Sequence, residues 1–378
     1  MKLGELIEIK HGYAFSGEHI VEDDNGIVLV TPGNFRIGGG FKEEKCKFFD
    51  GEIPADYVLK EGDFIVTMTD LSKTIDTLGY SALVPKSKRT YLHNQRIGLV
   101  TFKSGECDRG YIYWLMRTRE YQRSIANTST GATVHHTSPK KIYDYDLEVP
   151  PLPIQHRIAT ILSRYDSLIE NYQKQIKLLE EAAQRLYKEW FIDLRFPGYE
   201  NTNIIDGVPE GWEKKSITDV LEIKYGKDHK LLKEGTIPVY GTGGIMRYVE
   251  KSLFTGESVL IPRKGSLNNI MLVGGTFWTI DTMFYSIPKE NNVAKIVYFY
   301  LKGVDMYSFN IGAAVPSMTV NILSGMKLLV PNEDVKNKFE TIASKYFIRM
   351  HSLQSQLRLL TEARDRLLPK LMSGEIEI

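Results

Sequence analysis

The chain has 378 residues, enough for two or three domains, and its 42% hydrophobic and 25% charged contents are ordinary for a soluble globular protein. Its 48 Lys and Arg residues are balanced by 47 Asp and Glu residues, which excludes a strongly basic chain, so any DNA contact needs a local basic face. Two cysteines, Cys46 and Cys107, exclude a disulfide framework, and no apolar run reaches membrane-spanning length, so we expect a cytoplasmic protein without membrane contact.

Residues 1–150 are predicted to form a first globular domain, the first head, of mixed α/β structure. Short apolar runs bounded by Gly and Pro are typical of strands. The predicted strands are residues 6–10, 27–30, 63–68, 97–102 and 147–149, and residues 111–125 have helical spacing.

A long helix is predicted within residues 151–195. The Pro-rich residues 150–153 end the first head and can precede a helix. From 154 to 190, apolar residues recur at steps of three and four, as a heptad seam requires. The predicted seam consists of Ile161, Tyr165, Leu168, Tyr172, Ile176, Leu179, Ala183, Leu186 and Trp190.

Residues 196–332 restart the pattern of the first head and are predicted to form a second head. Four stretches of the first head return in order. The echoes are 217–226 for 3–12, 256–261 for 62–66, 311–315 for 130–134, and 328–331 for 147–150. The two heads otherwise differ in sequence.

A second long helix is predicted within residues 333–378, with its seam between 335 and 371 and Asn332 as N-cap. It repeats the first helix at a constant shift of 181 positions, for example from Gln173 to Gln354 and from Leu178 to Leu359. We therefore predict an α+β tandem repeat, head–helix–head–helix, whose two seams bury each other within one chain. Two unlike heads on a common scaffold favour two reading surfaces, and a duplication without an asymmetric task is the alternative.

Polar loops next to the predicted strands are the candidate DNA-binding residues. Base reading needs polar side chains on loops, with Lys and Arg on phosphates, and Arg suits guanine as Asn or Gln suits adenine. In the first head the candidates are Thr67, Thr69, Ser72 and Lys73 beside Asp70, and Lys88, Arg89, Asn94, Gln95 and Arg96 beside Lys86, Tyr91 and His93. In the second head they are Arg263, Lys264, Ser266, Asn268 and Asn269, with Tyr240 and Thr242 near Thr279 and Asp281. For each residue, a solvated loop is the alternative.

Several short patterns resemble catalytic motifs without their essential partners. Half of a nuclease pattern, Glu-x-Lys, occurs at residues 8–10 and 222–224 without a suitable aspartate pair. Residues 241–244 are Gly-rich but lack the spacing of a phosphate-binding loop, so a tight turn is favoured. His135 and His136 have no partner at zinc-ligand spacing, which favours a loop or core role. No adenine-methyltransferase motif and no Walker motif is present, so we predict neither catalytic residues nor metal ligands.

Six further motifs span nearly the whole sequence. They are Gly-Tyr-Ala-Phe at 12–15, Asn-Gln-Arg-Ile-Gly at 94–98, Pro-Pro-Leu-Pro-Ile-Gln-His-Arg-Ile-Ala at 150–159, Leu-Tyr-Lys-Glu-Trp-Phe at 186–191, Pro-Glu-Gly-Trp-Glu at 209–213 and Leu-Leu-Pro-Lys-Leu-Met-Ser-Gly-Glu at 367–375. In these motifs, their order and their spacing, the chain resembles the specificity subunit of type I restriction–modification systems. The first head lacks the Pro-Glu-Gly-Trp opening, and the second helix begins with Asn332-Glu333-Asp334, so the two halves need not bind partners identically.

The resemblance implies two target-recognition domains, 1–150 and 196–332, each reading one part of a split site in double-stranded DNA. It implies that the helices of 151–195 and 333–378 pack antiparallel and hold the domains apart. It also implies a subunit without catalytic activity or cofactor, which docks two methyltransferase subunits and, in the full complex, two motor–nuclease restriction subunits. S-adenosylmethionine, ATP and Mg then belong to those partners.

Helix length independently supports two DNA-reading domains held apart by the long helices. A helix of about 37 residues is about 55 Å long at about 1.5 Å per residue, which exceeds the roughly 34 Å of one DNA turn. Heads held at its two ends would meet the duplex more than one turn apart, so coil length would set the spacer of a bipartite, asymmetric site. The alternatives are a stand-alone DNA-binding or nuclease protein with its own active site, and a coiled-coil adaptor that does not bind DNA.

Overall fold

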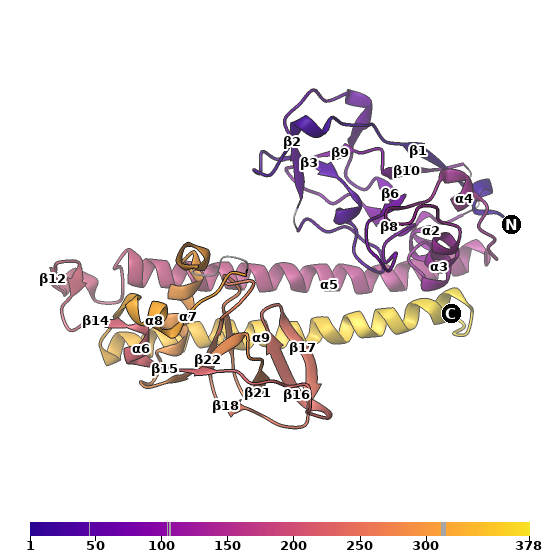
Figure 1. The fold of residues 1–378 in the computed structure, drawn as a ribbon. Helices are drawn as coiled ribbons and strands as arrows, with labels where there is room; N and C mark the ends of the chain where they lie inside the picture. The colour runs from indigo at the N-terminus through magenta and orange to yellow at the C-terminus, as the bar shows by residue number, and fades with distance from the viewer. Residues whose placement is uncertain (45, 104, 106, 311–314) are drawn as a thin grey trace. The chain divides into compact units, whose positions relative to one another are not determined.

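The computed structural model describes residues 1–44, 46–103, 105, 107–310 and 315–378, which divide into two compact units. Unit 1 is Met1–Asn171 with Gln356–Ile378, and unit 2 is Tyr172–Ser355. The boundaries between the units fall inside two long helices, α5 (Leu152–Tyr187) and α9 (Glu333–Met372) (Figure 1). Each unit therefore contains one head and a part of each long helix. Most of the third sequence echo, residues 311–314, lies outside the described residues.

Both long helices confirm the heptad prediction. α5 continues from Tyr187 through a π-helical turn, η4 (Lys188–Ile192). Asn332 caps α9 as predicted, because its Oδ1 accepts a hydrogen bond from the Val335 N–H at 3.0 Å. An ion pair of 2.6 Å between Asp334 and Lys338 follows in the first turn, where the helix dipole favours the acid.

Among the residues that the structure describes in unit 1, the first head forms three small sheets. The four-stranded antiparallel sheet has the order β1 (Ile7–His11), β10 (Ile97–Phe102), β6 (Phe64–Thr67), β8 (Ser81–Leu83). The five-stranded sheet has the order β2 (Ile20–Val21), β4 (Lys47–Phe49), β3 (Ile27–Val30), β9 (Thr90–His93), β5 (Val58–Leu59), and β11 (His135–His136) pairs with β7 (Thr69–Asp70). The short helices are α1 (Leu3–Leu6), α2 (Arg109–Leu115), α3 (Arg119–Asn127) and α4 (Pro139–Tyr143).

With residues 311–314 left aside, the second head in unit 2 contains two four-stranded and two two-stranded sheets. The first has the order β15 (Leu221–Tyr225), β22 (Met283–Pro288), β19 (Ser258–Pro262), β20 (Met271–Val273), and the second β17 (Gly244–Val249), β16 (Glu234–Gly241), β21 (Thr276–Thr279), β18 (Phe254–Thr255). The pairs are β14 (Glu213–Ser216) with β23 (Lys327–Val330) and β12 (Ile204–Ile205) with β13 (Val208–Pro209). The helices are α6 (Ile217–Val220), α7 (Ala294–Lys302) and α8 (Val320–Gly325).

The two heads share one scaffold, which gives the α+β tandem repeat that the sequence predicts. α1 and β1 return as α6 and β15 at a shift of 214 positions, and the strand order β1-β10-β6-β8 returns as β15-β22-β19-β20. Each first strand is followed by a glycine that lies directly against the backbone of a neighbouring turn. A Cβ on Gly12 would lie 2.1 Å from the Asn94 carbonyl oxygen, and one on Gly226 would lie 2.0 Å from that of Ile280. No larger residue fits at either position.

The predicted strand 6–10 is confirmed as β1, which begins one residue later because residues 3–6 form α1. Two other predicted elements of the first head are wrong in detail. The helical stretch 111–125 is two helices, because Asp108 and Thr118 each cap a separate helix by accepting the N–H of Tyr111 (2.7 Å) or Tyr121 (3.2 Å). Residues 147–149 are not a strand. Their counterparts in β23 pair with β14, whereas here only Lys2 forms a bridge, to Asp146.

Each head buries its core against the start of the helix that follows it and the end of the other long helix. In unit 1 the core includes Ile158 and Leu162 of α5 and Leu368 and Leu371 of α9. At a shift of 181 positions, unit 2 uses Phe339 and Ala343 of α9 and Tyr187 and Trp190 at the end of the first helix. The predicted seam needs one correction. Leu168 is 44% exposed and Ile169 is buried, since the buried stripe of this segment continues from Leu162.

Candidate nucleic-acid interface

One turn and one loop of each head lie at the same end of the equivalent four-stranded sheets. A turn precedes β10 in the first head (94–96) and β22 in the second head (280–282). A loop follows β6 in the first head (68–77) and β19 in the second head (263–269). Matching backbone hydrogen bonds join them, from Met68 N to Arg96 O (2.9 Å) in unit 1 and from Arg263 N to Thr282 O (2.8 Å) in unit 2. The sequence echo therefore corresponds to one loop scaffold carrying different side chains.

In the first head, the turn before β10 presents Gln95 and Arg96. Asn94 is buried, and its Oδ1 accepts the Arg96 N–H at 3.0 Å, while the Gln95 N–H donates to the Tyr13 carbonyl at 2.9 Å. Both bonds fix the backbone of the turn. The side chains of Gln95 and Arg96 are exposed and have no hydrogen-bond partner among the described residues. Asn94 thus shapes the turn, and its two neighbours are available to a ligand.

Lys88 and Arg89 do not join this turn. They precede β9, whose four residues span about 13 Å at about 3.3 Å each, whereas Asn94 follows it. Lys88 is exposed. The Arg89 guanidinium is paired with Asp24 and, at 3.5 Å, with Glu43. Arg89 is therefore part of a local ionic cluster at the other end of the strand.

The Asp70 carboxylate holds the loop after β6 together through hydrogen bonds to the backbone of the loop. Thr67 and Thr69 are buried, and their hydroxyls bond to the Thr69 carbonyl (2.9 Å) and the His136 ring (3.2 Å). Neither threonine has surface for a duplex in this conformation. Asp70, also buried, accepts the N–H groups of Ser72 (2.6 Å) and Thr77 (2.6 Å). Ser72 is half-buried, its Oγ accepting the Asp76 N–H at 3.0 Å, and Lys73 is exposed.

Replacement of Asp70 by Asn is expected to loosen this loop. Burial alone raises the pKa of Asp70, but hydrogen bonds from Ser72 and Thr77 outweigh it and hold the pKa below its ordinary 3.8. A depressed folded pKa means that the carboxylate stabilises the fold above about pH 4 and that this contribution is lost as pH falls through the folded pKa. Urea unfolding of Asp70→Asn should show a loss of about 1–3 kcal/mol at pH 7 that shrinks in acid. An equal loss at all pH values would contradict this account.

In the second head, the predicted asparagines hold the loops together. Asn269 Nδ2 donates to the Thr242 carbonyl at 2.6 Å, and Asn268 bonds through Nδ2 to Asp305 (3.1 Å) and through Oδ1 to the Met306 N–H (2.8 Å). Because both amide groups are engaged, these residues support the β16–β17 turn and the loop after β19. Thr242 is half-buried in that turn.

The remaining candidates of the second head differ in exposure. Arg263 lies 5.2 Å from the Tyr225 ring and donates to the Asp281 carbonyl at 3.0 Å. Lys264 and Ser266 are exposed, and their side chains have no partner among the described residues. Tyr240 is half-buried, and burial raises the pKa of its phenol, so it is a neutral group beside the Thr242 turn.

The repeat identifies further residues at this end of the sheets and gives Asp281, named from the sequence beside Thr279, its place among them. Tyr13, 42% exposed, follows Gly12, and Lys227 is its exposed counterpart after Gly226. Asp281 and Thr282 occupy the places of Gln95 and Arg96. The shift of 214 positions could have paired the first two. The pairing of the turns depends on strand register, which sequence alone does not give. The turns therefore offer an amide and a guanidinium in one head, and a carboxylate and a hydroxyl in the other.

His136 also lies in this cluster, but in the short strand β11 and not in the loop or core position expected from the sequence. It pairs with β7 and contacts Thr69 through its ring. Within the described ranges, no group of three His, Cys, Asp or Glu side chains is arranged to hold a metal ion. The helices of the same part of the chain include none that is both long and apolar enough to cross a membrane.

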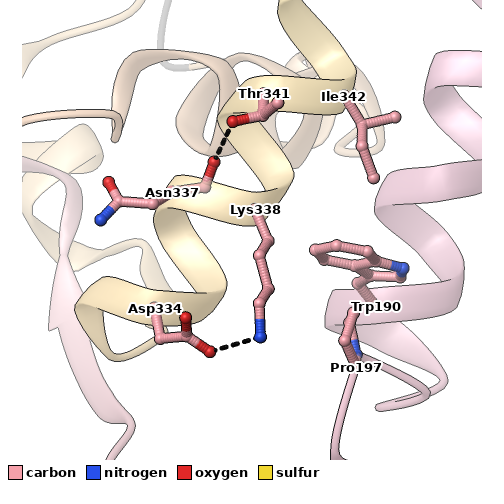
Figure 2. A pocket seen from close by; sticks show the side chains of 7 residues that line it. All are labelled: Trp190, Pro197, Asp334, Asn337, Lys338, Thr341 and Ile342. Carbon is pink, nitrogen blue, oxygen red and sulfur yellow. Dashed lines mark hydrogen bonds and ion pairs between the residues drawn. The ribbon is translucent and has the colours of Figure 1, made fainter.

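A separate surface feature lies at the start of α9 in unit 2. A cavity of about 440 Å³ is lined by Trp190, Pro197, Asp334, Asn337, Lys338, Thr341 and Ile342 (Figure 2). At the shift of 181 positions, Arg157, Thr160 and Ile161 of α5 replace Lys338, Thr341 and Ile342, with the same exposure at each position. Similar side chains are thus exposed at the start of both long helices, although the heads differ.

Comparison with known proteins matches the chain to one family. The family described as Type I restriction modification DNA specificity domain matches residues 1–181 and 209–353. The type I restriction enzyme MjaIX specificity subunit of Methanocaldococcus jannaschii is 26% identical over 340 residues, which cover 80% of this chain and 76% of that protein. The HindI specificity subunit of Haemophilus influenzae is 21% identical over 348 residues, covering 68% and 75%.

A solved structure has the same fold. The crystal structure of the type I restriction–modification S subunit from M. genitalium aligns with a TM-score of 0.63 and 18% identity, covering 98% of this chain and 95% of that one. At this identity the likeness concerns the fold.

Proposed function

Because this chain belongs to the type I restriction modification DNA specificity family, we propose that its two heads read the two halves of a bipartite, asymmetric DNA site. The observation that carries the proposal is the pair of equivalent turns, Gln95-Arg96 and Asp281-Thr282, on one scaffold. Equal scaffolds give both heads the same way of approaching DNA. Unequal side chains give them different sequences to read.

The chemistry of the turns suits base edges. A Gln amide pairs with adenine, Arg with guanine, and an Asp carboxylate accepts from the amino group of cytosine. Exposed lysines of the neighbouring loops, Lys73 in the first head and Lys227 and Lys264 in the second, supply cations for phosphates. The proposal assigns base reading to the turns and backbone contacts to these lysines.

We propose that α5 and α9 set the spacer between the half-sites. α5 has 36 residues and α9 has 40, so each is about 54–60 Å long at about 1.5 Å per residue. Both helices contribute to both units. A change of helix length therefore acts on the two heads together, which is the property a ruler requires.

We propose further that the chain is a non-catalytic subunit that docks two methyltransferase subunits, with two restriction subunits in the full complex. The similar exposed side chains at the starts of α5 and α9, together with the cavity of Figure 2, support two related docking surfaces. S-adenosylmethionine, ATP and Mg are assigned to those partners.

Single substitutions in the two turns test base reading. Gln95→Ala is expected to relax one position of one half-site, and Asp281→Ala one position of the other, each removing about 1–3 kcal/mol of discrimination. Adenine-methylation mapping of DNA from cells that carry the chain and its methyltransferase reports both half-sites together. Asp23→Ala, an exposed residue of the β2–β3 loop, should change neither half-site, and omission of the chain should abolish site-specific methylation. If both half-sites change with either turn variant, independent reading by the heads is wrong.

A further inference from the structure

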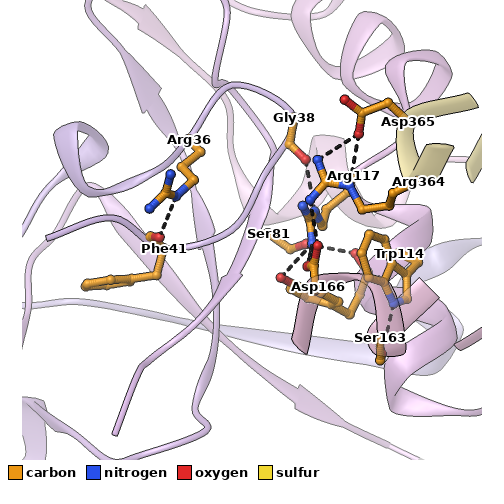
Figure 3. Close-up of polar contacts among 11 residues, drawn as sticks. Arg36, Gly38, Phe41, Ser81, Trp114, Arg117, Ser163, Asp166, Arg364 and Asp365 are labelled. Carbon is orange, nitrogen blue, oxygen red and sulfur yellow. Dashed lines mark hydrogen bonds and ion pairs between the residues drawn. The ribbon is translucent and has the colours of Figure 1, made fainter. Parts of the chain in front are cut away.

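The junction between the first head and the long helices is closed by a buried arginine. Arg117, whose side chain is 4% exposed, lies 4.3 Å from the Trp114 ring and pairs with Asp166 of α5 at 2.5 Å. Its guanidinium also donates to the Gly38 carbonyl and the Tyr113 hydroxyl, each at 2.9 Å. Arg364 of α9 pairs with the second oxygen of Asp166 at 2.6 Å (Figure 3). A guanidinium therefore lies between an aromatic ring and a carboxylate. We call this arrangement of Trp114, Arg117, Asp166 and Arg364 the arginine lock.

The second head has the same junction with different side chains. At a shift of 185 positions, Tyr113, Trp114 and Arg117 at α2 correspond to Tyr298, Phe299 and Lys302 of α7. On the long helices, at the shift of 181, Asp166 becomes Phe347 and Arg364 becomes Ala183. Both partners of the arginine lock are thus absent from these positions, and Lys302 is exposed instead of buried.

An open cavity of about 210 Å³ occupies the place of the lock in unit 2. It is lined by Glu180, Glu181, Ala183, Gln184, Tyr298, Phe299, Lys302, Phe347 and Met350. Three aromatic rings and two carboxylates therefore face one space. Burial, and then the charge of Glu180, raise the pKa of Tyr298 to about 12, in keeping with a carboxylate close to the phenol.

The cations already present do not neutralise these carboxylates fully. Lys295 lies 5.9 Å from the Phe347 ring, but its ammonium is paired with Glu257 (2.5 Å) and Glu340 (2.7 Å). Arg185 approaches Glu181 only at 3.8 Å, from an exposed position. Arg185 and Lys302 are both exposed, so the described residues place no buried cation between the aromatic rings and the two carboxylates, and the cavity can accept one.

We propose that this cavity binds the guanidinium of an arginine side chain presented by a partner chain, in the place that Arg117 fills in unit 1. Arginine suits the site better than lysine, because a planar guanidinium stacks on aromatic faces and bonds two carboxylates at once. The identity of the partner as a methyltransferase subunit rests on the function proposed above. The binding of a guanidinium in the cavity is independent of that function.

A small arginine probe tests the site on the full-length chain alone. With methionine methyl groups labelled with ¹³C, titration with N-acetyl-arginine amide should shift the signal of Met350, which is identified by its loss in Met350→Leu. N-acetyl-citrulline amide, which has the same shape without the charge, should not shift it. No shift with the arginine probe, or an equal shift with citrulline, would overturn the proposal.

Matched variants locate the effect. Glu180→Gln combined with Glu181→Gln changes two exposed residues and should weaken the probe at least tenfold. Glu362→Gln, the equivalent of Glu181 in the other repeat, should leave the probe affinity unchanged. Equal effects of both would assign the shift to general charge and refute a site in this cavity.

Assembly with the methyltransferase subunit tests the identity of the partner separately. The double variant should lower the affinity of that subunit, measured without DNA, whereas Glu362→Gln should not. If the probe binds the native cavity but assembly is unaffected, the arginine does not come from the methyltransferase. Neither result depends on base reading, so this proposal and the DNA-reading proposal fail independently.

Discussion

Deletion of seven residues from each long helix, 171–177 and 352–358, is expected to shorten the spacer between the half-sites by about three base pairs. Seven residues remove about 10 Å of helix at about 1.5 Å each, and a duplex rises about 3.4 Å per base pair along one strand. The two segments are equivalent at the shift of 181 positions, and neither contains a residue of the two large head cores. A whole heptad preserves the register of the seam. Both half-sites should therefore stay readable.

Methylation mapping gives the spacer and the half-sites in the same experiment. The control deletes 171–177 alone, which leaves the two helices unequal and should reduce methylation at any site. An unchanged spacer in the double deletion would refute the ruler proposal while leaving base reading by the heads intact.

Replacement of Lys295 by Met is expected to destabilise unit 2 by about 3–5 kcal/mol, the cost of leaving buried charges without their partner. The Lys295 ammonium is almost fully buried and lies between Glu257 of the second head and Glu340 of α9. Removing the lysine leaves two carboxylates facing each other. Ser344 donates to Glu340 at 2.6 Å, but a neutral hydroxyl cannot replace the positive charge.

Urea unfolding measures the loss, and hydrogen exchange places it in residues 172–355. Lys251→Met, at an exposed lysine of the second head, should change stability by no more than about 0.5 kcal/mol. Addition of Glu257→Gln and Glu340→Gln to Lys295→Met should restore most of the stability, because the unpaired charges are then gone. A triple variant no more stable than the single one would show that packing of the lysine stem, and not its charge, was lost.

Long-range periodicity made the architecture predictable. The helices repeat at a fixed shift over about 37 residues, and Asn332 has the right side chain at the right position to cap the second. The strands 27–30 and 97–102 were predictable because an apolar run between turn residues is visible in the local sequence, whichever strand it pairs with. The strand at 147–149 failed for the opposite reason, since a strand depends on a neighbour, and here only a short contact forms, with Met1 bonded to Leu147 and Lys2 bridged to Asp146.

The candidate site was predictable as loops and less so as side chains. Thr67, Thr69 and Arg89 have the polarity of surface residues. Within the fold, however, their side chains bond to the Thr69 carbonyl, the His136 ring and the Asp24 carboxylate, respectively. Whether a polar side chain faces water or a buried partner depends on tertiary contacts that a local pattern does not contain. Gln95 and Arg96 were correctly placed on an exposed turn. Asp281 was named from the sequence only as a neighbour of Thr279, and its equivalence to Gln95, like that of Thr282 to Arg96, depends on strand register.

The composition of the two cores determines the order in which the chain can fold. The core of unit 2 is drawn from residues 183–343 alone. The core of unit 1 joins Leu3 and Leu6 to Leu368 and Leu371, a separation of about 360 residues that makes closure slow. During synthesis, the first head emerges long before α9, so its apolar faces remain open and exposed to chaperones or aggregation. The first head, although translated before α9, is therefore expected to be the last part of the described chain to reach its native state.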